Sequence, residues 1–344
     1  MFGESIGSPS LVIGFIVFIL AMLSLDLGVF HRKHHKVSFR EALIWSIVWV
    51  SLAMVFNLAV YFWFGSNTAL EFFTGYVIEK ALSVDNLFVF VAIFAYFDIS
   101  PVLQHRVLFW GILGALIMRA LFIMVGGAML SHFHWTMYLF GGILVLTGIK
   151  LLKQRSQEVA VDRTLIVRAL KRLFPITNEH HGPRFFWRQD GQWFITPLFL
   201  ALITVEMSDL IFAVDSIPAV FAITSDPFIV FTSNIFAILG LRSLYFLLAG
   251  MLGRFQYLKV GLAAVLIFVG LKMLISGVIK ISILFSLGVI GLVLVGSVLA
   301  SLGVARKQDI SHRSGADKSL CDNNKDGAGK TSFPDSQSDL VGPR

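Results

Sequence analysis

Long apolar runs, rather than alternating apolar and polar positions, dominate this chain. Each of nine runs is about 20 residues long, the length a helix needs to cross a hydrocarbon core of about 30 Å. A spanning segment must satisfy its own backbone, and runs of this length favour helices over a barrel. We therefore predict an all-α polytopic membrane protein with about nine transmembrane helices. They are placed at residues 10–30, 42–64, 71–97, 107–130, 136–152, 195–224, 228–251, 260–279 and 282–304.

Composition supports this class of protein and excludes a soluble one. The chain has 344 residues, of which 56% are hydrophobic and 14% charged, and its mean hydropathy is +0.80. A net charge of +7 would suggest nucleic-acid contact in a soluble chain, but basic loops on one side of a membrane explain it better here. The single cysteine, Cys321, excludes a disulfide framework.

The distribution of Lys and Arg predicts the orientation. Fifteen of them fall in the loops and loop margins at 31–41, 98–106, 153–194 and 252–259, against only Lys280 on the opposite side. Because cytoplasmic loops carry the excess of basic residues, the N-terminus is expected outside and the C-terminus in the cytoplasm.

Three regions follow from this topology. Residues 1–304 form the transmembrane domain, with a cytoplasmic loop at 153–194. Residues 305–344 form a polar, Gly- and Ser-rich tail without periodicity, which we expect to be disordered.

Two of the apolar runs resemble each other. "DNLFVFVAIFAYFDISP" begins at Asp85 and "DLIFAVDSIPAVFAITSDP" begins at Asp209, and the two aspartates align. The predicted topology gives these helices opposite directions. We therefore predict a 3+3 inverted repeat over about 71–152 and 195–279, a common transporter plan with a site at the repeat interface.

Charged residues at membrane depth mark the candidate site. Such a residue costs about 2.5–3.5 kcal/mol on insertion scales, so it usually faces protein or water and is functional. The two repeat units share this pattern, each with acids followed by an arginine. The candidate metal ligands are the acids Glu79, Asp85, Glu206, Asp209 and Asp215. Their charge partners or gate would be Arg119 and Arg242.

Structural ion pairing is the alternative interpretation of these charges. Five acids outnumber the two arginines, although Lys80, Lys150 and Lys272 could reduce the excess. An unpaired carboxylate cluster is suited to a cation or to protons.

The chemistry of the neighbouring residues narrows the cation. Supporting oxygen ligands would come from Ser83, Asn86, Ser216 and Asn234. An all-oxygen set suits hard divalent ions such as Mg²⁺, Ca²⁺ and Mn²⁺. Carboxylates released by the metal could load protons, so proton-coupled exchange is a natural mechanism.

Helical geometry raises one difficulty. Asp209 and Asp215 stand six residues apart, about 120° around a straight helix. Either the helix breaks near Pro218 and frees carbonyl ligands, or Asp215 serves a second position on the ion path.

The residues that carry this chemistry also resemble a known family. "GYVIEKALSVDNLFVF", "VEMSDLIFAVDSIPAVFAIT", "DPFIVFTSNIFAILGLRSLYFLLAGML" and "YLFGGILVLTGIK" resemble the TerC family of bacterial inner-membrane proteins over about residues 10–304. The resemblance implies a multi-helix membrane protein associated with tellurite resistance and, in one branch, with manganese export or redox modulation. The family's acidic positions carry over to residues all present here: Glu79, Asp85, Asn86, Glu206, Asp209 and Asp215.

The leading hypothesis is therefore a multi-pass inner-membrane transporter that exports Mn²⁺, in exchange for protons. The expected partners are the ion and the lipid bilayer, without nucleic acid, without a permanently bound cofactor and without enzyme activity. Two alternatives stay open: a membrane scaffold or redox modulator acting through loop 153–194, and a Ca²⁺ or Mg²⁺ transporter of the same architecture.

Overall fold

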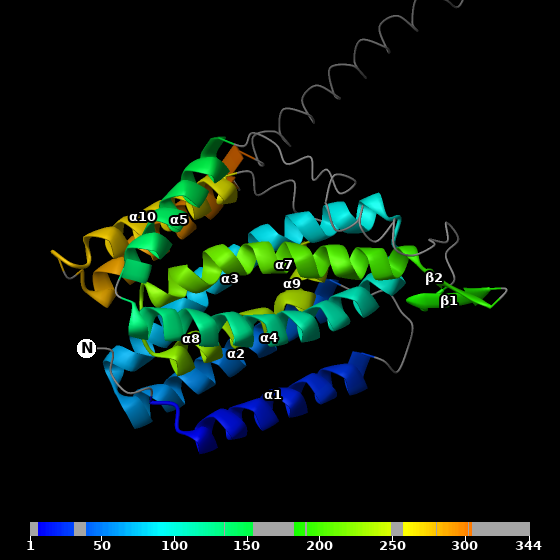
Figure 1. Ribbon diagram of the computed structural model, residues 1–344, viewed down its shortest axis with the longest axis horizontal. Coiled ribbons are helices and arrows are strands. Elements are labelled where there is room, and N and C mark those ends of the chain that lie inside the picture. The colour runs from blue at the N-terminus through cyan, green and yellow to red at the C-terminus, as the bar shows by residue number, and fades with distance from the viewer. Residues whose placement is uncertain are drawn as a thin grey trace, which may run out of the picture.

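The computed structural model describes residues 6–30, 39–133, 135–153, 182–189, 191–248, 257–279, 281–301 and 303–304, without the side chains of residues 25–30 and Asp85. These residues form a helical bundle with one small hairpin (Figure 1). The labelled elements are α1 (Pro9–Phe30), α2 (Phe39–Phe64), α3 (Ser66–Tyr96), α4 (Pro101–His132), α5 (Trp135–Lys153), β1 (Phe186–Gln189), β2 (Gln192–Ile195), α7 (Pro197–Phe221), α8 (Pro227–Leu239), α9 (Leu241–Leu248) and α10 (Leu258–Ile275). A last helix spans Ile283–Ser301.

The predicted all-α polytopic membrane fold is confirmed. Seven of the described helical segments are long and apolar enough to cross a membrane, with α8 and α9 together forming one of them. α3 also has the length to cross, although it carries four charged residues, Glu71, Glu79, Lys80 and Asp85. Each of the nine apolar runs coincides with a helix, or with the α8–α9 pair, to within a few residues at most ends.

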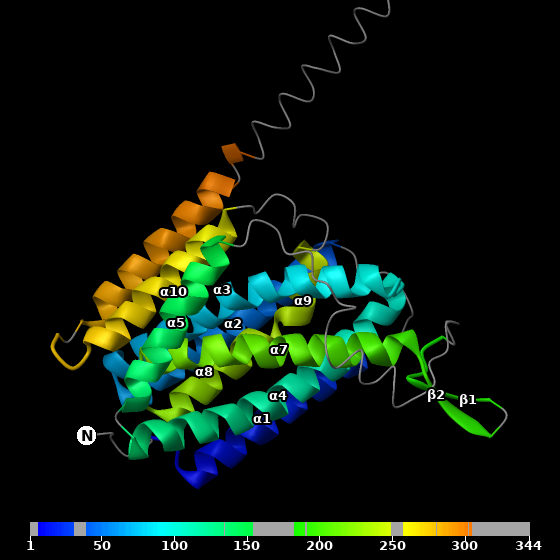
Figure 2. The same ribbon diagram turned by 45° about the horizontal axis from the view of Figure 1, so that its top comes forward.

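Four helices, α3, α4, α7 and α8, form the centre of the bundle. α3 packs on α7 and α8, and α4 packs on the same two helices. α8 is the most enclosed of them, with eleven of its thirteen residues buried. α2 covers α3 and α9, α1 lies along one edge, and α5, α10 and the last helix form a group on another side (Figures 1 and 2).

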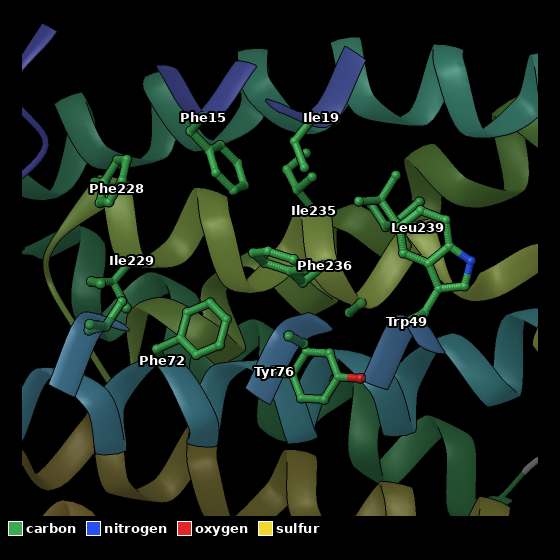
Figure 3. Packing of buried hydrophobic residues seen from close by; sticks show 14 of the residues in the cluster. Phe15, Ile19, Trp49, Phe72, Tyr76, Phe228, Ile229, Ile235, Phe236 and Leu239 are labelled. Atoms are coloured by element: carbon green, nitrogen blue, oxygen red, sulfur yellow. The ribbon is translucent and has the colours of Figure 1, made fainter. Parts of the chain in front are cut away.

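Aromatic rings fill the space around α8. The ring centroid of Phe236 on α8 is 5.7 Å from that of Phe15 on α1 and 6.0 Å from that of Phe72 on α3. Figure 3 shows these rings with Trp49 of α2 and Tyr76 of α3 in one cluster. Aromatic side chains bury large areas, so this cluster fixes α1, α2 and α3 around the central helix.

The predicted helix break near Pro218 is wrong. α7 continues through Pro218 to Phe221, and the carbonyl of Pro218 accepts a hydrogen bond from the N–H of Ala222. Proline removes one backbone donor, and so close to the end of a transmembrane helix this loss is tolerated. The interruption lies instead at Gly240, between α8 and α9.

The hairpin β1–β2 lies in the segment predicted as a loop. Its two strands pair in antiparallel register, with Phe186 opposite Ile195 and Gln189 opposite Gln192. The connecting dipeptide is Asp190-Gly191, and Gly191 has φ = +83°, which glycine adopts without steric cost. Residues 154–181 of the predicted loop and the predicted tail at 305–344 lie outside the described residues, so those predictions stand untested.

Candidate functional site

Arg119 of α4 occupies the middle of the four-helix centre. Its side chain is 1% exposed and donates hydrogen bonds to residues of the three other central helices. Nε and Nη2 contact the two carboxylate oxygens of Asp209 on α7, at 3.4 and 3.2 Å. Nη1 donates to Glu79 on α3, to Asn234 Oδ1 on α8 at 2.8 Å, and to Ser216 Oγ on α7 at 3.4 Å. We call these five residues the Arg119 centre.

The charges of the Arg119 centre do not balance. Glu79 and Asp209 are both buried, and Arg119 is the cation that pairs with them among the described residues. When both carboxylates are ionised, their charge exceeds that of the one guanidinium by one negative charge. Within the described chain, Oε2 of Glu79 and Oγ of Ser83 are buried and accept or donate no hydrogen bond. The Arg119 centre therefore has oxygen atoms and charge available for a further cation or a proton.

Glu206 lies next to the Arg119 centre, on the surface where α7 packs against α4. It precedes Asp209 by three residues, so the two acids share a face of α7. Its carboxylate occupies the space that a side chain at Gly114 would fill. Glu206 is half-buried and has no hydrogen bond or ion pair within the described chain.

Asp215 lies on a different side of α7, as the predicted angular offset requires. Its Oδ1 accepts a hydrogen bond of 2.8 Å from Thr147 of α5. It lines a cavity of about 120 Å³ together with Asn86, Lys150 and Ser216. Because Ser216 also contacts Arg119, the cavity adjoins the Arg119 centre.

Asn86 is a polar side chain that faces this cavity. It is 2% exposed and makes no hydrogen bond with the described residues. A cavity of this volume with several polar partners is large enough to hold water. The cavity can therefore hold water next to the Arg119 centre.

The structure does not bring together all of the predicted site residues. Asp85 is on α3, but its side chain lies outside the described set. Arg242 of α9 is buried, and its Nη1 lies 3.4 Å from Nδ1 of His105 on α4. Among the described residues, no three His, Cys, Asp or Glu side chains are close enough to hold a metal ion.

Sequence reasoning did not identify three polar features. Thr147 donates a hydrogen bond to Asp215, but no sequence motif distinguishes this threonine. In the N-terminal part of α3, Glu71 accepts a hydrogen bond of 2.6 Å from Thr224. Nearby, Asp226 caps α8 and accepts a hydrogen bond from the N–H of Ile6. Glu71 was detectable as a further acid in the same apolar run as Glu79.

Comparison with known proteins identifies a family of membrane proteins and several similar chains. Residues 64–309 match the family model described as "Integral membrane protein TerC family". A Myxococcus xanthus protein named "Uncharacterized membrane protein STKORF319" is 56% identical over 87% of this chain and 93% of its own. A Salmonella typhi protein named "Putative membrane-bound redox modulator Alx" is 44% identical over 89% of this chain and 98% of its own. No solved structure matches the chain.

Proposed function

Because the chain belongs to the TerC family of integral membrane proteins, we propose that it is an ion transporter of the bacterial inner membrane. Its substrate is a divalent cation, Mn²⁺, which it exports in exchange for protons. The observation that carries this proposal is the Arg119 centre, in which two buried carboxylates share one guanidinium at the junction of four helices. Ionisable groups at this depth are costly and are usually retained for function.

The chemistry of the Arg119 centre supports a hard cation. The atoms that face Arg119 are carboxylate, amide and hydroxyl oxygens, which suit Mg²⁺, Ca²⁺ and Mn²⁺. These same oxygens are the acceptors of the guanidinium. An ion that binds them must therefore compete with Arg119, and Arg119 neutralises the acids when the ion has left.

In the same proposal, Glu206 and Asp215 are additional ion-binding positions on either side of the Arg119 centre. Glu206 faces α4, whereas Asp215 faces α5 and the cavity. In this mechanism Asp85 is a further ligand, and Arg242 is a gate at the α4–α9 contact. Carboxylates left by the ion take up protons, which provides the exchange.

The packing pattern is consistent with the proposed inverted repeat. Suppose that α3, α4 and α5 of the first unit correspond to α7, α8–α9 and α10 of the second. Interchanging the two units then turns the α3–α8 contact into the α4–α7 contact, and both are present. The same interchange leaves the α5–α10 contact unchanged. This arrangement would place the Arg119 centre at the interface of the two units, where such transporters bind their ions.

A redox modulator is the second candidate function, because the name of the Salmonella typhi relative contains that term. A single cysteine cannot form an intramolecular dithiol pair, so this function would have to act through a partner or another group. It predicts that neutralising the buried acids spares the function and that charge changes in loop 153–194 abolish it. The transporter predicts the reverse.

Flux of Mn²⁺ into liposomes of controlled protein orientation tests the proposal. We expect Glu79→Gln and Asp209→Asn to lower the flux by about tenfold or more, since even indirect partners of a metal change affinity by that factor. Asp98→Asn is the matched control, because Asp98 is exposed and its left-handed backbone, φ = +49°, suits asparagine.

Three outcomes separate the alternatives. Absence of Mn²⁺ flux in the wild type would overturn the proposal. Equal loss in Asp98→Asn would assign the effect to surface charge. Flux of Ca²⁺ or Mg²⁺ that exceeds the Mn²⁺ flux at equal concentration would identify one of these ions as the substrate.

A further inference from the structure

The seventh apolar segment crosses the bundle as two half-helices. α8 ends at Leu239 and α9 begins at Leu241, with Gly240 at φ = −84° and ψ = 2° between them. In an uninterrupted helix the N–H of Leu241 would bond the carbonyl of Ala237. At this break, Nζ of Lys80 donates to that carbonyl at 3.1 Å.

Lys80 reaches the break from α3. Lys80 directly follows Glu79, but the two side chains have different partners. Glu79 pairs with Arg119, whereas Lys80 donates to the carbonyl of Ala237 and forms no ion pair within the described chain. The partial negative charge at the C-terminal end of α8 explains how an ammonium is stabilised there.

The surroundings of the break accommodate a cation. A β-carbon on Gly240 would lie 2.7 Å from Nζ of Lys80 and 3.3 Å from Cβ of Trp49, so glycine provides the space that the ammonium uses. Tyr76 precedes Lys80 by one turn of α3. Its buried hydroxyl has no hydrogen bond within the described chain and is directed toward Trp49 in the view of Figure 3.

The break is also linked to the Arg119 centre. α8 is held at two points one turn apart, at Asn234 by Arg119 and at Ala237 by Lys80. A change at the Arg119 centre that releases Asn234 therefore acts on the half-helix that Lys80 holds.

We propose that Lys80 is a tethered counter-cation. Its ammonium takes the place at the C-terminal end of the half-helix α8 that a coupling alkali ion takes in other transporters with broken helices. The protein therefore needs neither Na⁺ nor K⁺ to hold the break. The consequence for ion flux rests on the proposed transport function, but the role of Lys80 in holding the break does not.

The test is thermal unfolding of the full-length protein in lipid nanodiscs, without divalent ions, in choline, Na⁺ or K⁺ chloride at equal ionic strength. We expect Lys80→Ala to be less stable than the wild type in choline and to recover in Na⁺ or K⁺. An alkali ion at about ten times its Kd raises the ratio of folded to unfolded protein about elevenfold. Lys80→Met is the matched control, because its apolar chain fills the same space without a charge, and it should not respond to the salt.

The proposal is overturned if Lys80→Ala shows no difference between choline and the alkali ions, or if Lys80→Met or the wild type gains as much stability from the alkali ions as Lys80→Ala does. Failure to recover Lys80→Ala from membranes in either salt also overturns it, because the added ion should restore the fold. None of these measurements involves Mn²⁺. Their failure can therefore be distinguished from a failure of the proposed transport function.

Discussion

Arg119 shows how one side chain organises a buried polar site. Its planar guanidinium offers five N–H donors, and two of them bind Asp209 in the bidentate geometry that suits a carboxylate. Further contacts reach Glu79 of α3 and Asn234 of α8, so all four central helices meet at this residue. Removing a buried cation leaves its acids without compensation, and this loss is much larger than that of a surface charge.

Arg119→Gln should therefore destabilise the protein strongly. We expect a loss of about 3–5 kcal/mol in the free energy of unfolding, the usual cost of breaking a buried ion pair. Arg106→Gln is the control on the same helix, because Arg106 is exposed and lies 5.1 Å from the ring of Phe185. Its cation–π contact is worth about 0.5–1 kcal/mol. Denaturant unfolding of both variants in detergent measures the difference.

A second measurement on these variants separates an ion site from a purely structural pair. If ion and guanidinium compete for the same oxygens, Mn²⁺ stabilises Arg119→Gln more than it stabilises the wild type. An equal response of wild type and both variants to Mn²⁺ would contradict that competition.

At the scale of the element, glycines decide how closely α5 and α10 approach. A β-carbon on Gly141 would lie 2.9 Å from the carbonyl oxygen of Gly270, and one on Gly270 would lie 2.8 Å from that of Gly141. In lipid, helices associate through close packing rather than through a hydrophobic driving force, so small residues at the contact are favoured. The two carbonyls belong to the backbone and cannot move aside as a flexible side chain could.

Gly141→Ala should separate the two helices and lower stability by about 1–3 kcal/mol, the typical cost of overpacking. Gly142→Ala provides the control, because a β-carbon at this neighbouring position meets nothing within 4 Å. It should be neutral or stabilising by up to about 1 kcal/mol through helix propensity. Thermal unfolding of the two variants, differing by one position, is the measurement. A similar loss in both would show that helix flexibility, not contact with α10, is responsible.

For the whole molecule, the basic loops make a prediction about orientation. The charge asymmetry places the N-terminus outside and residue 321 in the cytoplasm. Cys321 is the only cysteine, so a membrane-impermeant maleimide should label the natural protein in inside-out vesicles and not in right-side-out ones. Protein labelling followed by mass spectrometry measures this.

The matched control moves the cysteine to the other side. In a Cys321→Ser background, Asn67→Cys near the beginning of α3 should react only in right-side-out vesicles. Labelling of both cysteines from the same side would show that the predicted topology is wrong.

The sequence alone determined the class of the protein and the positions of its apolar helices. Hydrophobic length is a local property, so each of the nine runs could be recognised without knowing its neighbours. The buried charges were also visible, because an acid in an apolar run such as Glu79 or Asp209 is costly wherever the run packs. The hairpin was missed although Asp-Gly between β-prone residues marks such a turn.

Only the tertiary structure decided which of these charges meet. Helix crossing brought Arg119 to Glu79, Asp209 and Asn234, whereas it left Arg242 beside His105. It also placed the break at Gly240, where Lys80 supplies a donor from another helix, and not at Pro218. Sequence spacing fixes the direction of a side chain around its own helix, but its partner depends on the angle and depth at which another helix crosses.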